Sequence, residues 1–156
     1  MNAQWWGPLP ATNFLRGRHG NPTTLIVDHW MAGTMASADA RFKKPGEQAS
    51  AHFGIGQDGR LVQWVQIEDT AYHCGVFTKN LISIGIEHEA GPTVGPTAAL
   101  YRTSAAVHAW LARLFDIRLE AGVTVLGHRD ISPTQCPGTL DLDKIVREAN
   151  MDEAQI

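Results

Sequence analysis

The chain has 156 residues, of which 44% are hydrophobic and 19% are charged, and its formal net charge is −3. This length and composition predict one soluble globular domain that buries a core of its own. A slightly negative chain without a long lysine or arginine run excludes a nucleic-acid-binding polycation, and no segment has the roughly 20 apolar residues of a membrane span. The short basic cluster at residues 41–44 is interpreted as a solvated face.

The N-terminal residues 1–22 are rich in glycine, proline and tryptophan and are predicted to form an irregular arm. They lack the basic start and apolar run of a secretory signal, so we expect synthesis in the cytoplasm without a signal peptide. In that reducing compartment Cys74 and Cys136 are expected to remain unpaired, which directs attention to metal binding or catalysis. Residues 23–150 are expected to form the catalytic domain and residues 151–156 a tail.

The first predicted elements are a strand, a short helix and a hairpin. The β-branched and apolar stretch 23–31 predicts a strand that ends near His29. Residues 37–44 predict a short helix capped by Ser37. Residues 50–65 predict two strands joined by an Asp-Gly turn.

The second half of the chain predicts a strand, a long helix, another strand and a terminal helix. Residues 81–91 predict a strand whose isoleucines point one way and whose Glu87 points the other. Residues 97–117 carry a helical apolar stripe, residues 122–128 predict a strand, and residues 141–150 predict the last helix. This order predicts an α/β (α+β layered) domain with a central mixed sheet flanked by helices.

Three residues that bind metals well lie at or beyond the ends of predicted strands, namely His29, His128 and Cys136. Two imidazoles and a thiolate are a known set of protein ligands for a catalytic zinc ion, whose fourth position holds water. The alternative is structural: a single strand histidine is usually a core or surface residue, and a single cysteine is usually a small buried hydrophobe. The residues alone leave both interpretations open.

Glu87 and His73 are further candidates for chemistry. A carboxylate on an otherwise apolar strand is costly to bury unless it is paired or functional. Glu87 is therefore either a general base beside a metal-bound water or the partner of an arginine. His73, in the sequence Ala-Tyr-His-Cys-Gly, is a candidate donor to a developing oxyanion.

Five motifs carry a resemblance when they are taken in this order: VDHW, SAHFGIGQDG, AYHCG, NLISIGIEHEAG and GHRDISPTQCPG. Together they resemble the zinc-dependent N-acetylmuramoyl-L-alanine amidases of the type-2 family. That family includes phage amidase-type lysozymes, cytoplasmic muropeptide amidases and animal peptidoglycan recognition proteins. The resemblance covers roughly residues 22–148.

The resemblance implies one Zn²⁺ ion per chain, held by His29, His128 and Cys136. Phage lysozymes of the family carry a catalytic tyrosine where this chain has Ala51. With that tyrosine missing, the resemblance favours Glu87 as the general base, as in the cytoplasmic muropeptide amidases.

The resemblance also offers two alternative residues for stabilising the oxyanion, Thr134 or His73. Thr134 stands where phage lysozymes carry a catalytic lysine and active recognition proteins carry threonine. His73 falls in a substrate-facing histidine motif. The implied reaction is hydrolysis of the amide between N-acetylmuramic acid and L-alanine in peptidoglycan or a muropeptide, by a monomer that needs neither nucleic acid nor a membrane anchor.

Four biological roles follow from these expectations. We favour a phage endolysin that acts at the cell wall with a holin-type helper for export. The alternatives are a cytoplasmic muropeptide-recycling amidase, a non-catalytic peptidoglycan-binding module, and a cysteine hydrolase that uses Cys136 with His128. The presence of Cys136 argues against the non-catalytic module, and Pro137 directly after the thiol argues against the cysteine nucleophile.

Overall fold

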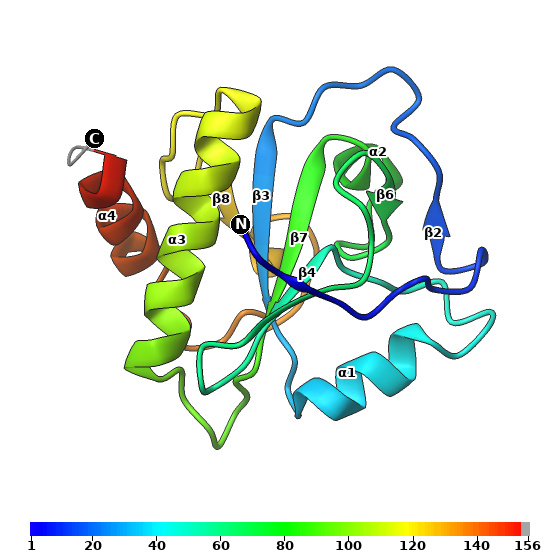
Figure 1. Cartoon of the computed structure of the whole chain (residues 1–156), viewed down its shortest axis with the longest axis horizontal. Helices are drawn as coiled ribbons and strands as arrows, with labels where there is room; N and C mark the ends of the chain where they lie inside the picture. The colour runs from blue at the N-terminus through cyan, green and yellow to red at the C-terminus, as the bar shows by residue number, and fades with distance from the viewer. Residues whose placement is uncertain (154–156) are drawn as a thin grey trace.

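The computed structural model describes residues 1–153 and is built around a mixed sheet of six strands (Figure 1). In spatial order the strands are β1 (Gln4–Trp5), β5 (Leu61–Gln63), β4 (Phe53–Ile55), β7 (Ser83–His88), β3 (Leu25–Trp30) and β8 (Val125–Gly127). Strands β4, β7, β3 and β8 run parallel to one another, whereas β5 pairs antiparallel with β4. The predicted α/β domain with a central mixed sheet is confirmed.

Helices cover both faces of this sheet. The remaining elements are α1 (Met35–Phe42), α2 (Phe77–Asn80), α3 (Ala98–Phe115), α4 (Leu142–Glu153), the 3-10 turn η1 (His128–Asp130), and the pair β2 (Phe14–Leu15) and β6 (Thr70–Ala71). Figure 1 shows α3 and α4 side by side at one side of the molecule and α1 at the other. Among the described residues, no helix combines the length and apolar character needed to cross a lipid bilayer.

Alternation along β3 and β7 divides the side chains of the domain between two faces. Ile26, Ile84 and Ile86 are fully buried in the main core, which α3 and α4 complete. Because a strand sends successive side chains to opposite faces, His29 and Glu87 lie on the other face of the sheet. There they line one cavity.

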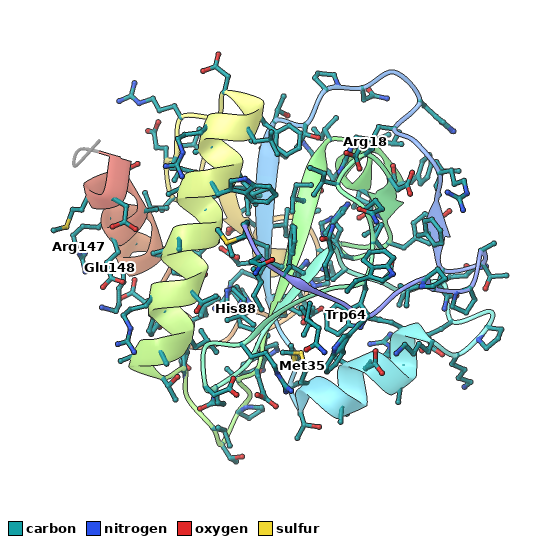
Figure 2. All side chains as sticks on the ribbon, viewed as in Figure 1. Arg18, Met35, Trp64, His88, Arg147 and Glu148 are labelled. Carbon is teal, nitrogen blue, oxygen red and sulfur yellow. The ribbon has the colours of Figure 1, made fainter. Side chains whose placement is uncertain are left out.

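A second core packs α1 against that other face, around the indole of Trp64. The Trp64 ring meets Phe42 edge-on with centroids 5.1 Å apart, and its Nε1 donates to Asp39 Oδ1 at 2.8 Å. Gly54 of β4 leaves room for the indole, because a Cβ there would lie 2.5 Å from it. Figure 2 shows Trp64 and Met35 together between the sheet and α1. This core fixes α1 beside the cavity.

The helix caps test the sequence predictions closely. The long helix α3 begins after Thr97, as predicted, and the Thr97 hydroxyl accepts a hydrogen bond from Leu100 N. The predicted cap of α1 was wrong, because Thr34 rather than Ser37 occupies that position. Ser37 is instead the third residue of the helix and completes a capping box with Thr34.

The two ends of the chain are more regular than the sequence predicts. Within residues 1–22, β1 pairs with β5 and β2 pairs with β6, so the arm contributes two short strands. At the other end α4 continues to Glu153, so the helix includes the start of the predicted tail. The rest of that tail lies outside the described residues.

Candidate metal centre and active site

Two strand ends and one loop bring His29, His128 and Cys136 together. Their ligand atoms all lie within 4.8 Å of one another. His29 Nδ1 is 3.7 Å from Cys136 Sγ, close to the spacing of about 3.6 Å that these two atoms have on one tetrahedral zinc ion. The rings of His29 and His128 have centroids 4.8 Å apart. The donor set and its spacing therefore fit a zinc ion.

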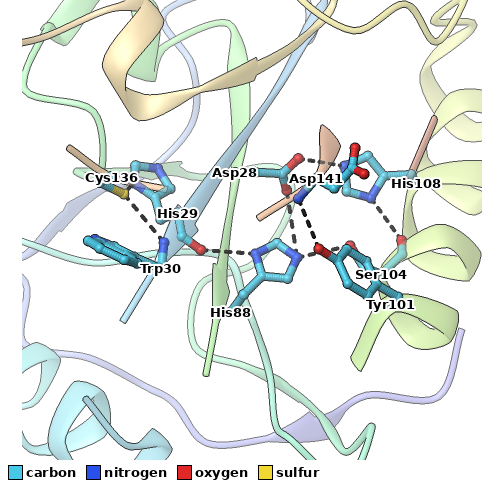
Figure 3. Close-up of polar contacts among 9 residues, drawn as sticks. All are labelled: Asp28, His29, Trp30, His88, Tyr101, Ser104, His108, Cys136 and Asp141. Atoms are coloured by element: carbon cyan, nitrogen blue, oxygen red, sulfur yellow. Dashed lines mark hydrogen bonds and ion pairs between the residues drawn. The ribbon is translucent and has the colours of Figure 1, made fainter. Parts of the chain in front are cut away.

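Backbone contacts fold the loop that carries two of these residues. Strand β8 lies beside β3, so His128 begins η1 next to the end of β3. The Asp130 carboxylate accepts from Gly127 N at 2.8 Å, and Arg129 N donates to the Cys136 carbonyl at 2.8 Å. These bonds turn the chain back on itself between His128 and Cys136. The thiol of Cys136 accepts a hydrogen bond from Trp30 N at 3.3 Å, as Figure 3 shows.

The pKa values of His29 and Cys136 bear on whether these residues act as metal ligands or as a nucleophile. Burial, with the nearby His128, lowers the pKa of His29 to about 3, so its imidazole is neutral and free to bind a metal. Burial raises the pKa of the Cys136 thiol to about 12. A thiol in this state is a poor nucleophile, because the thiolate is the reactive form. A bound dication would supply the positive charge that stabilises the thiolate.

A chain of hydrogen bonds holds the outer nitrogen of His29. If His29 Nδ1 faces a metal, its proton lies on Nε2 and is donated to His73 Nδ1, 2.9 Å away. His73 Nε2 then donates to Ser83 Oγ at 2.9 Å, and Ser83 Oγ donates to the Lys79 carbonyl at 2.7 Å. Each donor in this series of three hydrogen bonds has one acceptor. Gly85 makes the approach of the ring possible, because a Cβ there would lie 2.5 Å from His73 Cγ.

His128, the second imidazole of this candidate site, has a neighbour on its outer side too. The carbonyl of Cys74 lies near the ring of His128 and raises its pKa, although burial lowers that pKa overall. Ser132 Oγ donates to the same carbonyl at 2.7 Å. Zinc-binding histidines are characteristically oriented in this way by a partner on their other nitrogen. Both imidazoles of the site therefore have the surroundings expected of metal ligands.

Glu87 lies beside His29 across the sheet, because the two residues are register partners in the parallel pair of β3 and β7. Among the described residues, Glu87 Oε2 is buried and has no hydrogen-bond partner. Burial raises the pKa of Glu87 to about 8, and the positive charge of Arg41 opposes that shift. Glu87 as a whole is half-buried, and a cavity carboxylate with one buried, unpartnered oxygen is in the environment expected of a general base.

The cavity itself has a volume of about 280 Å³ and contains all six residues singled out from the sequence: His29, His73, Glu87, His128, Thr134 and Cys136. Thr134 Oγ1 accepts a hydrogen bond from Cys136 N at 3.2 Å, which leaves the hydroxyl proton available. His73 differs from the sequence expectation in its surroundings, because both of its ring nitrogens already have protein partners.

The opposite face of β3 carries a buried polar network that the sequence did not predict. Asp28 Oδ2 accepts from His108 Nε2 of α3 at 3.1 Å, and His108 Nδ1 contacts the Ser104 carbonyl at 2.8 Å (Figure 3). His88 Nδ1 donates to the carbonyl of His29 at 2.9 Å, and its Nε2 is 2.9 Å from Ser104 Oγ. The network anchors the backbone of β3, the strand that carries His29, to α3. Its only sequence signal is an aspartate directly before His29.

The sequence of this chain is similar to those of known amidases. A family model described as N-acetylmuramoyl-L-alanine amidase matches residues 19–139. The 1,6-anhydro-N-acetylmuramyl-L-alanine amidase AmpD of Escherichia coli (strain K12) is 37% identical over 92 residues, which cover 55% of this chain and 49% of that protein. The chain spans about half the length of the curated relatives it matches.

Solved structures share the fold over nearly the whole chain. A selenomethionine derivative of AmpD superposes with a TM-score of 0.77 at 26% identity, covering 94% of this chain and 93% of that chain. A mutant endolysin from Bacillus subtilis superposes with a TM-score of 0.76 at 20% identity, covering 96% of this chain and 99% of that chain.

Proposed function

Because this chain belongs to the type-2 family of N-acetylmuramoyl-L-alanine amidases, we propose that it hydrolyses the amide bond between N-acetylmuramic acid and L-alanine. Residues 23–150 are proposed as its catalytic domain. The observation that carries the proposal is the convergence of two imidazoles, a thiol and a half-buried carboxylate on one cavity. Their chemistry fits metal-assisted amide hydrolysis.

In this proposal His29, His128 and Cys136 hold one zinc ion. Zinc bound there would polarise the scissile carbonyl and lower the pKa of a water from 15.7 towards roughly 7. The charge of the zinc ion would also oppose the rise that burial causes in the pKa of Glu87, and would favour the ionised carboxylate. Glu87 takes a proton from the attacking water and passes it to the nitrogen of the leaving L-alanine.

Thr134 stabilises the negative charge that develops on the carbonyl oxygen. Its hydroxyl proton is available because its oxygen is the acceptor in the bond from Cys136 N. A donor held beside the reacting carbonyl favours the tetrahedral transition state over the ground state. His73 has no free ring nitrogen for the same task, so we propose that it positions His29 instead.

Replacing His73 with asparagine is expected to weaken zinc binding by about 10- to 100-fold, the usual effect of removing an outer partner of a metal ligand. Zinc dissociation constants are measured by competition with a chromophoric chelator, without reference to turnover. His19→Gln, at an exposed histidine outside the cavity, is the matched control. A His73 variant that keeps its zinc affinity but loses kcat would assign His73 to the oxyanion and contradict the positioning role.

Two substrates remain open to an amidase with this site. We favour intact peptidoglycan and an endolysin role, with a holin-type helper for export. The cavity that contains the three proposed metal ligands, called the metal cavity below, adjoins a surface cleft of about 650 Å³, and a cleft of this size suits a polymer. The 37% identity to AmpD supports soluble 1,6-anhydromuropeptide as the second candidate.

The test incubates the purified protein with purified peptidoglycan and, separately, with soluble anhydromuropeptide. We expect turbidity to fall and new lactyl carboxyl groups and L-alanine amino termini to form. A chelator should stop the reaction, and added Zn²⁺ should restore it. Cleavage of the soluble fragment alone would favour recycling, and one bound zinc without cleavage of either substrate would favour a non-catalytic binding module.

A further inference from the structure

A larger cleft lies directly beside the metal cavity. Its volume is about 650 Å³, and it shares Arg41, Ala49, Tyr72 and His73 with the metal cavity. A substrate with its scissile amide at the metal centre would therefore extend one of its arms into this cleft. The lining also includes Phe77, whose side chain is exposed.

The lining of the cleft has one formal charge, and it is positive. Among the described residues that line it, Arg41 is the only charged side chain. The polar groups around it are neutral and come from Thr12, Gln48, Tyr72 and Asn80. Without a carboxylate in its lining, the cleft favours a negatively charged ligand.

The guanidinium of Arg41 is fixed on one side and open on the other. Its Nε donates to Glu47 Oε1 at 3.0 Å, and the other oxygen of Glu47 is 3.7 Å from Lys44 Nζ. The Glu47 carboxylate is thus shared by two cations, and the three side chains together keep a net positive charge. The Arg41 side chain is 62% exposed, and in the hydrogen bonds of the described residues it donates only through Nε. Its terminal N–H groups are therefore free to form a paired contact with an anion.

We propose that Arg41 binds a free carboxylate on the peptide that follows L-alanine in the substrate, which makes it a specificity-determining residue. This inference rests on the proposed amidase function. The planar guanidinium matches a carboxylate with two parallel hydrogen bonds, and its contact with Glu47 orients it before the ligand arrives. The sequence suggested only a solvated face for residues 41–44, because it did not reveal the cleft beneath the end of α1.

The test uses two synthetic substrates, N-acetylmuramoyl-L-alanyl-D-glutamate with free carboxylates and the same compound with both carboxyls amidated. We expect the zinc-loaded parent protein to prefer the free acid by about 10-fold in kcat/KM, the scale of a charged hydrogen bond near the surface. Arg41→Gln should reduce this preference to about one, mainly through KM. Arg41→Lys keeps the charge but not the planar fork, so it should restore only part of the preference. Arg102→Gln, at an exposed arginine of α3, is the control.

The ratio of the two substrates separates this inference from the proposed function. A substitution of Arg41 that merely alters the reactivity of Glu87 changes kcat/KM for both substrates by the same factor. That factor cancels in the ratio of the two kcat/KM values. Equal cleavage of both compounds by the parent, or a preference that persists in Arg41→Gln, would overturn the Arg41 assignment and leave the amidase function standing. If neither compound is cleaved, calorimetric binding to Glu87→Gln protein decides: tighter binding of the acid that depends on Arg41 supports the subsite, and equal binding overturns it.

Discussion

Replacing Cys136 with serine is expected to abolish stoichiometric zinc binding and to lower the rate of amide hydrolysis by about 10³-fold or more. The thiol lies 3.7 Å from His29 Nδ1 and accepts from Trp30 N, so its removal takes away one of the three proposed ligands. Loss of several kcal/mol of charge stabilisation in the transition state corresponds to a rate effect of roughly this size. Zinc content by mass spectrometry and kcat/KM on a muramoyl-L-alanine substrate are the two measurements.

The second cysteine supplies the control for this experiment. Cys74 is also buried, but its thiol donates to Asn80 Oδ1 at 3.0 Å, a bond that a serine hydroxyl can replace. Cys74→Ser should therefore keep one zinc per chain and the parental rate. A parent protein that stays fully active after its zinc has been removed by a chelator would contradict the metal role of Cys136 and revive the cysteine hydrolase.

Glu87→Gln is expected to keep zinc at one ion per chain and to lower kcat by about 10²-fold or more, the usual scale of general acid–base catalysis. Glutamine has the same shape but cannot accept the proton of the attacking water. Single-turnover hydrolysis and zinc content, measured on the same samples, separate the loss of the base from the loss of the metal.

Glu89 is the matched control, since it lies just after β7 and two residues beyond the proposed base. Its two oxygens accept from Met35 N at 2.8 Å and Gln57 N at 3.0 Å, so its role is structural. Glu89→Gln should lower the free energy of unfolding but not the rate per folded molecule. A fully active Glu87→Gln protein with bound zinc would remove Glu87 from the mechanism.

The same substitution should change how the stability of the metal-free protein depends on pH. Burial raises the pKa of Glu87 from an ordinary 4.5 to about 8, so folding favours its protonated form. The stabilising contribution of that proton is complete below pH 4.5 and is lost as the pH rises through 8. Glutamine removes this dependence, so Glu87→Gln should raise the urea midpoint more at pH 8.5 than at pH 5.

Local sequence patterns predict much of the fold and of the site. Alternation in two strands places His29 and Glu87 on one face, and the Asp-Gly turn predicts the hairpin of β4 and β5. The two-residue strands β1 and β2 carry no such pattern, because each exists only through pairing with a partner strand far away in the sequence.

Residue roles that depend on distant partners were the hardest to predict. Asp28 meets His108 across 80 positions, and neither residue has a neighbour in the sequence that announces the contact. His73 was expected to face the substrate, yet its ring nitrogens meet His29 and Ser83. The sequence identified the residues that gather at the cavity but not which atom of each faces the metal, the protein or the open space.

The register that pairs His29 with Glu87 has a consequence for protein engineering. The spacing between the proposed base and the neighbouring proposed ligand is set by the backbone pairing of two central strands, so it does not depend on the conformation of any surface loop. The residues over the large cleft, such as Arg41 and Phe77, stand on separate helices at its rim. The side chains of those helices that face the cleft can therefore be varied to redirect peptide preference, while the spacing of His29 and Glu87 stays set by the sheet.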